Sequence, residues 1–299
     1  MILVHCPAYE MDIGPHVFPT AKYRLVRERL LARGTASQAD FVEPEPASRA
    51  QLERVHTVEY LDDLESLRWT DRTGHSELPL TREIVDAYVL AAGGTLLAAR
   101  EAVARRALVG HLGGGFHHAF AAHAEGFCYV NDIAVAIRVL RQEARIGRAL
   151  VADLDLHQGN GTAHVFRDDA SVFTFSMHQQ RNYPVKQQSD LDIGMEDGTG
   201  DDGYLGALAD VWPAMVDRHK PDLVIYAAGA DPYEDDQLGA LKLTLGGLRR
   251  RDEMILTALH ERSIPGVVVL AGGYARHLDD TVEIHTRTLE TAAGLTGKR

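Results

Sequence analysis

One stretch of the chain reads Val151-Ala152-Asp153-Leu154-Asp155-Leu156-His157-Gln158-Gly159-Asn160-Gly161-Thr162, an apolar run that turns acidic and then glycine-rich. The apolar start predicts a buried strand, and the glycines predict a loop directly after it. Because side chains alternate along a strand, Asp153, Asp155 and His157 fall on one side. Burying three ionisable groups is costly unless they are paired or bind a metal ion. The stretch therefore predicts a metal site at the end of a buried strand.

The rest of the chain alternates short apolar runs with helix-length amphipathic segments. This pattern is typical of an α/β protein whose mostly parallel sheet has helices on both faces. The expected strands are Ile2–Cys6, Ala149–Leu154, Val172–Met177, Leu223–Ala228 and Val267–Ala271. The expected helices are Thr20–Arg33, Arg82–Arg106, Asn131–Ala144, Tyr204–His219, Leu248–Glu261 and His277–Thr291. Phe41–Ala50 is expected to be a surface loop. Without a repeat or a composition break, residues 1–299 are expected to form one domain.

Polar side chains follow several of these strands, where the carboxyl ends of a parallel sheet open into a crevice. His178, Asp231 and Tyr274 come after three different strands. Asp231 is the leading candidate for a third metal ligand beside Asp155 and His157. Imidazole nitrogen combined with carboxylate oxygen favours zinc or a similar transition ion, and three protein ligands leave one position open for catalysis. Each aspartate taken alone is more typical of a helix cap or a turn, and only the combination favours a metal site.

Two further glycine-containing stretches carry groups suited to catalysis. Gly113-Gly114-Gly115-Phe116-His117-His118 allows close approach of the backbone and then presents two imidazoles, which titrate near neutral pH and suit proton transfer. Leu270-Ala271-Gly272-Gly273-Tyr274 ends in a hydroxyl that can donate to a developing oxyanion. Tyr274 alone is equally typical of a pocket rim. Phe127 and Tyr183 are most simply core or rim aromatics.

Composition excludes several classes of partner. The formal net charge is −12, which disfavours direct binding to nucleic acid and to anionic membranes. The one basic run, Arg249-Arg250-Arg251, is expected to be a solvated helix face. Cys6 and Cys128 are too few for a disulfide framework, and no apolar run reaches about 18 residues. With no leader sequence recognisable, we expect a cytoplasmic protein that neither enters membranes nor binds nucleic acid directly.

These motifs together resemble the histone deacetylase superfamily, in order and over nearly the whole chain. The matching residues are Gly-Gly-Phe-His-His at 114–118, Gly-Phe-Cys at 126–128, Asp-Leu-Asp-x-His-x-Gly-Asn-Gly at 153–161, Ala-Gly-Ala-Asp at 228–231, Leu-Gly at 238–239 and Gly-Gly-Tyr at 272–274. The length, the His16–Pro19 entry and the Asn182-Tyr183-Pro184 loop look most like class IV and its bacterial relatives.

The resemblance implies a three-layer, arginase-like α/β domain with an eight-stranded, mostly parallel sheet. It implies one zinc ion (Zn²⁺) per chain on Asp155, His157 and Asp231. The implied substrate-binding residues are Gly126, Phe127, Tyr183, Leu238, Gly272 and Gly273. His118 would be the general base, and Tyr274 would donate to the oxyanion. His117, paired with Asp153, would be the second imidazole. A structural potassium ion (K⁺) is implied at Asp153, Ser176 and the backbone of Asp155 and His157.

Two departures from the family pattern bear on catalysis and substrate. Asn160 stands where many members have an aspartate partner for the general base, and a neutral amide orients His118 without raising its pKa as a carboxylate does. The chain start lacks the class I–II pattern. The substrate is therefore either an acylated lysine of a protein, with an acetyl or longer acyl group, or an acylated small amine such as a polyamine. The oligomeric state is left open.

Two other interpretations compete with a deacylase. A binuclear manganese ureohydrolase of the same fold needs additional bridging carboxylates, which Asn160 and the segment after Asp231 do not supply. A non-catalytic acyl-lysine-binding member would more often have lost His118 or Tyr274, and both are present.

Overall fold

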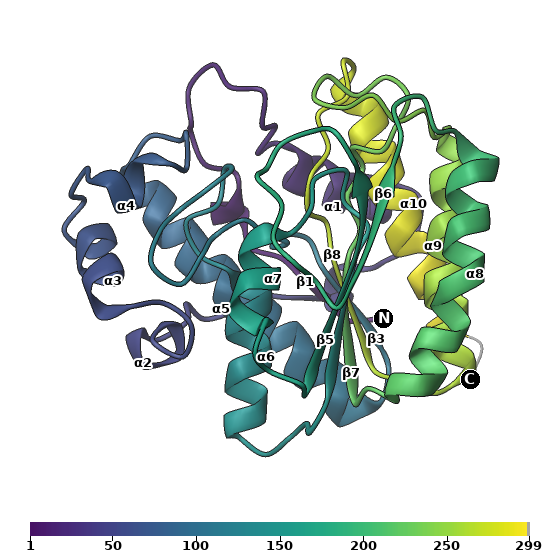
Figure 1. The fold of residues 1–299 in the computed structure, drawn as a ribbon, viewed down its shortest axis with the longest axis horizontal. Coiled ribbons are helices and arrows are strands. Elements are labelled where there is room, and N and C mark those ends of the chain that lie inside the picture. The colour runs from purple at the N-terminus through teal and green to yellow at the C-terminus, as the bar shows by residue number, and fades with distance from the viewer. Residues whose placement is uncertain (298–299) are drawn as a thin grey trace.

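The strands of the computed structural model, which describes residues 1–297, lie in one sheet whose neighbouring strands are all parallel (Figure 1). Across the sheet the order is β2 (Phe41–Val42), β1 (Leu3–Val4), β3 (Leu108–His111), β8 (Gly266–Val269), β7 (Leu223–Ala227), β4 (Ala149–Asp153), β5 (Val172–Gln179) and β6 (Leu191–Met195). The eight-stranded α/β fold expected from the sequence is confirmed.

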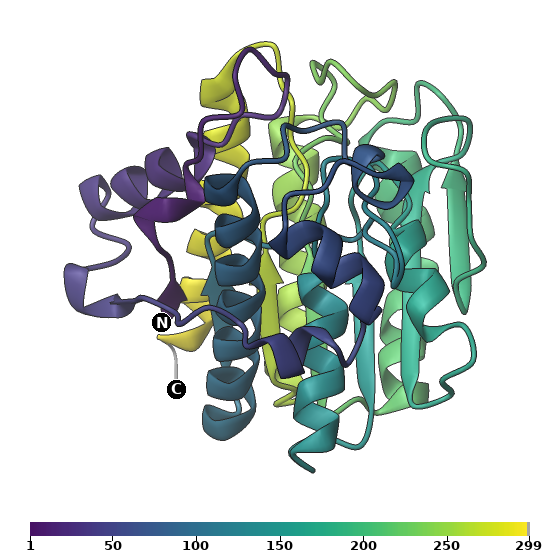
Figure 2. The ribbon, with the colours of Figure 1, turned by 90° about the vertical axis from the view of Figure 1, so that its left-hand side faces the viewer.

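Helices cover both faces of the sheet, which gives the expected three layers (Figures 1 and 2). One face carries α2 (Arg49–Leu52), α3 (Val58–Glu65), α4 (Asp71–Gly74), α5 (Arg82–Arg105), α6 (Asp132–Gln142) and α7 (Asn160–Phe166). The other carries α1 (Lys22–Ala32), α8 (Asp201–His219), α9 (Leu245–Glu261) and α10 (Leu278–Thr296). Two short 3₁₀ turns, η1 (Pro7–Tyr9) and η2 (Gln38–Asp40), complete the described elements.

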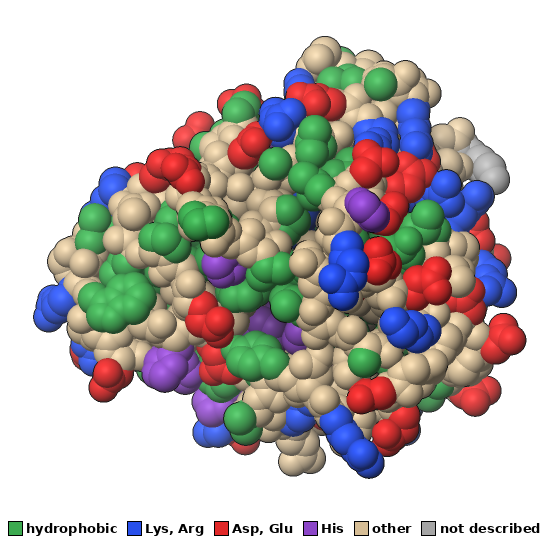
Figure 3. Space-filling model, turned by 90° about the horizontal axis from the view of Figure 1, so that it is seen from above, with side chains coloured by type: hydrophobic (Ala, Val, Ile, Leu, Met, Phe, Trp, Pro, Cys, Tyr) green, Lys and Arg blue, Asp and Glu red, His purple; other side chains and the backbone are tan. Residues whose placement is uncertain are grey.

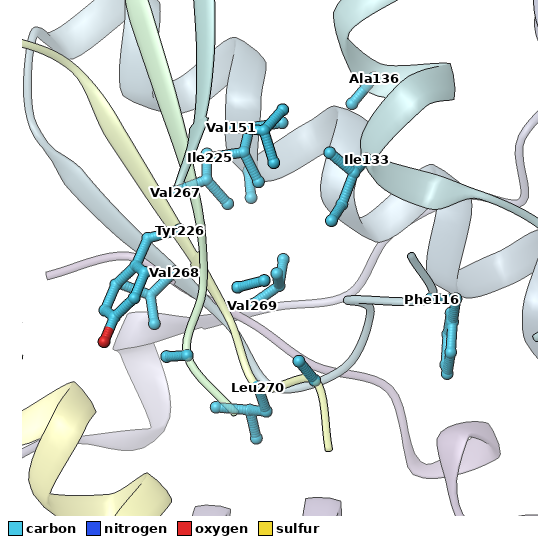
Figure 4. Close-up of a cluster of buried hydrophobic side chains, with 14 of the residues drawn as sticks. Phe116, Ile133, Ala136, Val151, Ile225, Tyr226, Val267, Val268, Val269 and Leu270 are labelled. Carbon is cyan, nitrogen blue, oxygen red and sulfur yellow. The ribbon is translucent and has the colours of Figure 1, made fainter. Parts of the chain in front are cut away.

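The central strands are buried on both sides because their residues are apolar without interruption. Val151 and Ile225 point toward Ile133 of α6, whereas Tyr226 and Val268 point to the opposite face (Figure 4). All five side chains are at most 1% exposed. Since both faces are filled with hydrophobic side chains, polar groups on these strands can reach a ligand only at the strand ends.

Helix α5 is the core helix on its face of the sheet. Among the described residues it alone is long and apolar enough to cross a membrane, and 67% of that apolar window is buried within the protein. It packs against α6 and β3. Thr81 caps its start by accepting a hydrogen bond from the Ile84 N–H, as Asn131 does for Ala134 in α6.

Several elements differ from the expectations. The sequence did not predict β3, β6 or the two residues of β2, which open the stretch Phe41–Ala50 that was expected to be a loop. Strand β5 runs to Gln179, so His178 lies within the strand and not after it. The unpredicted strands β2, β3 and β6 are short or interrupted by glycine and polar residues, so they lack the apolar pattern that identifies a buried strand.

Candidate active site

Three predicted metal ligands come together beyond the ends of β4 and β7. The ligand atoms of Asp155, His157 and Asp231 all lie within 4.8 Å of one another. The Nδ1 atom of His157 is 3.3 Å from Asp155 Oδ1 and 3.2 Å from Asp231 Oδ2. All three residues are at most 7% exposed. Two buried carboxylates at this distance repel each other unless a cation lies between them.

Backbone N–H groups hold both carboxylates in place. Asp155 Oδ2 accepts a hydrogen bond of 2.8 Å from the Gly272 N–H, and Asp231 Oδ1 accepts one of 2.9 Å from the Leu156 N–H. Gly272 has to be a glycine, because a Cβ there would lie 2.2 Å from Asp231 Oδ2. The loop after β8 therefore orients the Asp155 carboxylate by a backbone hydrogen bond and leaves room for the Asp231 carboxylate.

Arg251 joins the two loops that carry these ligands. It is fully buried, and its Nη1 donates to the carbonyl oxygens of Leu154, at 3.2 Å, and Gly229, at 2.7 Å. Its charge is paired with Asp252, with Nη2 2.8 Å from Oδ1. The prediction that this arginine belongs to a solvated face was wrong for Arg251, although the neighbouring Arg249 and Arg250 are exposed.

The two adjacent histidines lie beside the ligand cluster, their ring centroids 4.1 Å apart. His117 Nδ1 is 2.7 Å from Asp153 Oδ2, and His118 Nδ1 is 2.8 Å from Asn160 Oδ1. Both pairings agree with those expected from the sequence. Gly115, at φ +86°, brings this loop against Ala271, where a Cβ would come within 2.7 Å of the backbone.

The histidines differ in charge because their partners differ. Burial alone would lower the pKa of His117, but the carboxylates of Asp153 and Asp155 outweigh it and raise that pKa to about 9. Burial, with His117 and His157 nearby, lowers the pKa of His118 well below its ordinary value. At neutral pH His118 is therefore uncharged and has a lone pair available to accept a proton.

A cavity of about 190 Å³ leads to these groups. Figure 3 shows this end of the molecule, with histidine side chains visible in a hollow bordered by hydrophobic ones. The lining residues are Glu77, His118, Gly126, Phe127, His157, Asn182, Tyr183, Leu238 and Tyr274. Four of the six expected substrate-binding residues are thus in the lining. Gly272 and Gly273, which were expected to line the cavity, are not among the lining residues, and the Gly272 N–H faces the Asp155 carboxylate instead.

Tyr274 and Phe127 are placed in the cavity by local backbone contacts. The Tyr274 N–H donates to Asp236 Oδ2 at 2.7 Å, and the Tyr274 ring lies 5.9 Å from the Phe127 ring. Phe127 has a φ of +61°, unusual for a side chain of this size, and its N–H donates to Ser76 O at 2.9 Å. Asp236 was not predicted as a site residue, although it lies in the acidic loop that follows Asp231.

Two other acidic residues near the cavity were not predicted. Glu77 belongs to the lining. Glu125 accepts a hydrogen bond of 2.7 Å from Asn160 Nδ2. The one sequence signal for Glu125 is its place directly before the Gly126-Phe127 pair, since nothing local indicates contact with a residue 35 positions later.

Of the residues expected around a second cation, Asp153 lies next to both Ser176 and Asp155. Asp153 of β4 and Ser176 of β5 are register partners, and Asp153 Oδ1 accepts the Asp155 N–H at 3.2 Å. The Ser176 hydroxyl is 2.9 Å from His178 Nδ1.

Comparison with known proteins agrees with this architecture. An uncharacterized protein of Picosynechococcus sp. is 40% identical over 287 residues, covering 95% of each chain. Histone deacetylase 2 of Arabidopsis thaliana is 33% identical over 90% of this chain and 73% of its own. Acetoin utilization protein AcuC of Bacillus subtilis is 28% identical over 91% and 76%.

A solved structure, the HDA15 HD domain, has the same fold, with a TM-score of 0.82, 24% identity and coverage of 100% of this chain and 91% of the other. The family model of the histone deacetylase domain matches residues 16–289. A match of this extent, on a chain with this fold, means that the protein belongs to the histone deacetylase family.

Proposed function

We propose that this protein hydrolyses an N-acyl amide with the help of one zinc ion, and that its substrate is an acyl-lysine with an acetyl or longer acyl group. The main support for this proposal is the buried cluster of Asp155, His157 and Asp231, which lies beside His118 and Tyr274 at one cavity. The names of the Arabidopsis histone deacetylase and of the other family members support deacylation as the reaction class.

The donor set fits zinc in both chemistry and spacing. Tetrahedral zinc with bonds of about 2.0–2.1 Å has neighbouring ligand atoms about 3.3 Å apart. The nitrogen–oxygen separations here are 3.3 and 3.2 Å. Among residues 1–297 this is the one cluster of its kind, which argues against a two-metal ureohydrolase. When bound, zinc would polarise the amide carbonyl and lower the pKa of the attacking water.

The protein's own side chains supply the proton transfers. His118 accepts the proton of the attacking water at Nε2, because its Nδ1 is engaged with Asn160. Tyr274 donates a hydrogen bond from its hydroxyl to the oxyanion that develops as the water oxygen bonds to the carbonyl carbon. The C–N bond then breaks, the amine leaves with a proton supplied by the histidine pair, and the acyl group leaves as a carboxylate. His117 is oriented by Asp153.

A potassium ion is proposed beside Asp153, bound by its carboxylate, the Ser176 hydroxyl and the backbone carbonyls of Asp155 and His157. Its support is the register pairing of Asp153 with Ser176. A cytoplasmic protein without direct contact to nucleic acid or membranes is proposed on its charge of −12 and on its free cysteines.

An acylated small amine, such as an acetylated polyamine, is the second candidate substrate. Glu77 places a carboxylate in the cavity lining, where it would attract a cationic amine.

Turnover with a panel of substrates tests the proposal. The purified, zinc-loaded protein is offered acetyl-, butyryl-, octanoyl- and myristoyl-lysine peptides and acetylated polyamines. We expect hydrolysis of at least one acyl-lysine, loss of that activity with a chelator and recovery on adding zinc. Hydrolysis of acetylated polyamines alone would select the second candidate, and no turnover by the zinc-loaded protein would exclude both.

Replacing Gly272 with alanine is expected to weaken zinc binding by about 10–100-fold, the usual effect of disturbing groups that orient metal ligands. The new Cβ would lie 2.2 Å from Asp231 Oδ2 and 2.6 Å from Asp155 Oδ2. Zinc affinity is measured by competition with a chromogenic chelator. Gly206→Ala is the matched control, because a Cβ there meets nothing within 4 Å. Equal affinities of the two variants would contradict the role of Gly272.

A further inference from the structure

The orientation of the Asn160 side-chain amide determines which ring nitrogen of His118 carries the hydrogen. An amide can present either its oxygen or its NH₂ group to a neighbour, whereas an ionised aspartate at this position could only accept. If the NH₂ group faced His118 Nδ1, the imidazole would carry its hydrogen on Nε2, and no lone pair would be directed at the cavity. Something else in the structure must therefore fix the direction of the amide.

Two neighbours of Asn160 can bond in one way only. The Glu125 carboxylate can only accept, and its Oε1 lies 2.7 Å from Asn160 Nδ2. The Gly161 N–H can only donate, and it lies 3.0 Å from Asn160 Oδ1. Both contacts turn the amide oxygen toward His118, so His118 carries its hydrogen on Nδ1 and keeps the Nε2 lone pair free.

The position of Glu125 is fixed by further contacts. Its Oε1 also accepts from the Tyr183 hydroxyl at 3.3 Å, and its Oε2 lies 3.5 Å from His123 Nε2. Burial would raise the pKa of Glu125, but the bonds from His123 and Asn160 prevail and lower it. The ionised Glu125 carboxylate therefore hydrogen-bonds to Asn160 on the side away from His118, and it also hydrogen-bonds to Tyr183 of the cavity lining.

We infer that Glu125 is a positioning residue, which acts through Asn160 to set the tautomer of His118. Its carboxylate, linked to His118 through the Asn160 amide, takes the place of a carboxylate in direct contact with His118. The inference rests on the proposed role of His118 as general base. Glu125 contacts none of the reacting groups itself, and its effect is transmitted by the hydrogen bonds of Asn160.

A double-mutant cycle separates this role from a merely structural one. Glu125→Ala is expected to lower kcat about tenfold, a part of what a general base contributes, with KM changed less. Asn160→Asp alone is also expected to lower kcat, because its carboxylate would face that of Glu125 across 2.7 Å. In the double variant that repulsion is gone and the introduced carboxylate can only accept, so kcat is expected to rise above both single variants.

Two controls accompany the cycle. Tyr183→Phe removes the hydroxyl that touches Glu125 and leaves the Asn160 contact, so Asn160→Asp should not rescue it. Glu77→Ala removes an acidic residue of the cavity lining that has no hydrogen bond to Asn160, and Asn160→Asp should not rescue it either.

Nitrogen-15 NMR of the histidines gives a readout that does not depend on turnover. The His118 signal, identified by its loss in His118→Ala, should show the Nδ1–H tautomer in the wild type and a larger Nε2–H share in Glu125→Ala. An unchanged His118 tautomer in Glu125→Ala, or a double variant with a kcat no higher than that of the single variants, would overturn the inference. A wild type that turns over no substrate would instead reject the proposed function.

Discussion

Asp155→Ala is expected to abolish both zinc binding and hydrolysis. In the proposed zinc site Asp155 supplies one of the three ligands, and its Oδ2 accepts a hydrogen bond from the Gly272 N–H in the loop after β8. The remaining pair, His157 and Asp231, would have to bind the ion with one protein ligand fewer than a catalytic zinc site uses. Metal content by elemental analysis and turnover of acyl-lysine peptides are measured on the same preparation.

The control for this variant is Asp168→Ala, the same substitution in the exposed loop after α7, which should keep zinc and activity. Circular dichroism checks that Asp155→Ala is folded. A folded variant that is active without zinc would disprove the metal-dependent mechanism.

Tyr274→Phe is expected to lower kcat by about 10²–10³ while zinc stays bound, the range seen when one oxyanion donor is removed. The ring would stay in place, because the Tyr274 backbone N–H is held by Asp236 and the ring packs near Phe127. Only the hydroxyl that is proposed to donate a hydrogen bond to the developing negative charge is lost. Steady-state kinetics and zinc content are compared with the wild type.

Tyr233→Phe removes a hydroxyl from the neighbouring loop that is not in the cavity lining, so it should behave as the wild type. If Tyr274→Phe keeps a rate near that of the wild type, Tyr274 has no part in stabilising the transition state.

The fold could be predicted from the sequence where burial alone determines an element. The strands β4, β7 and β8 are nearly continuous apolar runs, as expected of strands that are buried on both faces of a parallel sheet. Strand β3 contains Gly110 and His111, and β6 at the sheet edge contains Asp192, so neither carries that pattern. Their pairing depends on neighbours far away in the chain.

The candidate site could be predicted where residues of one motif act together, as in Asp155 with His157 or His117 with His118. It could not be predicted for residues outside these motifs whose partners come from a distant segment, as for Glu125 with Asn160. Arg251 looks solvated in the sequence because its neighbours are charged, and it is buried because carbonyl oxygens from two other loops receive its hydrogen bonds. Which roles the assembled residues have in turnover stays a prediction until the variants are measured.

The buried Arg251 connects the loops of the proposed metal ligands with helices α9 and α10. It bonds to the carbonyl oxygens that directly precede Asp155 and lie two residues before Asp231, while Asp252 beside it receives the hydroxyls of Tyr226 and Thr288 at 2.5 Å each. Helices α9 and α10 therefore share one hydrogen-bonded network with the ligand loops. A substitution in α9 or α10 that disturbs Arg251 or Asp252 is therefore expected to shift the loops that carry the proposed metal ligands, although neither residue belongs to the cavity lining.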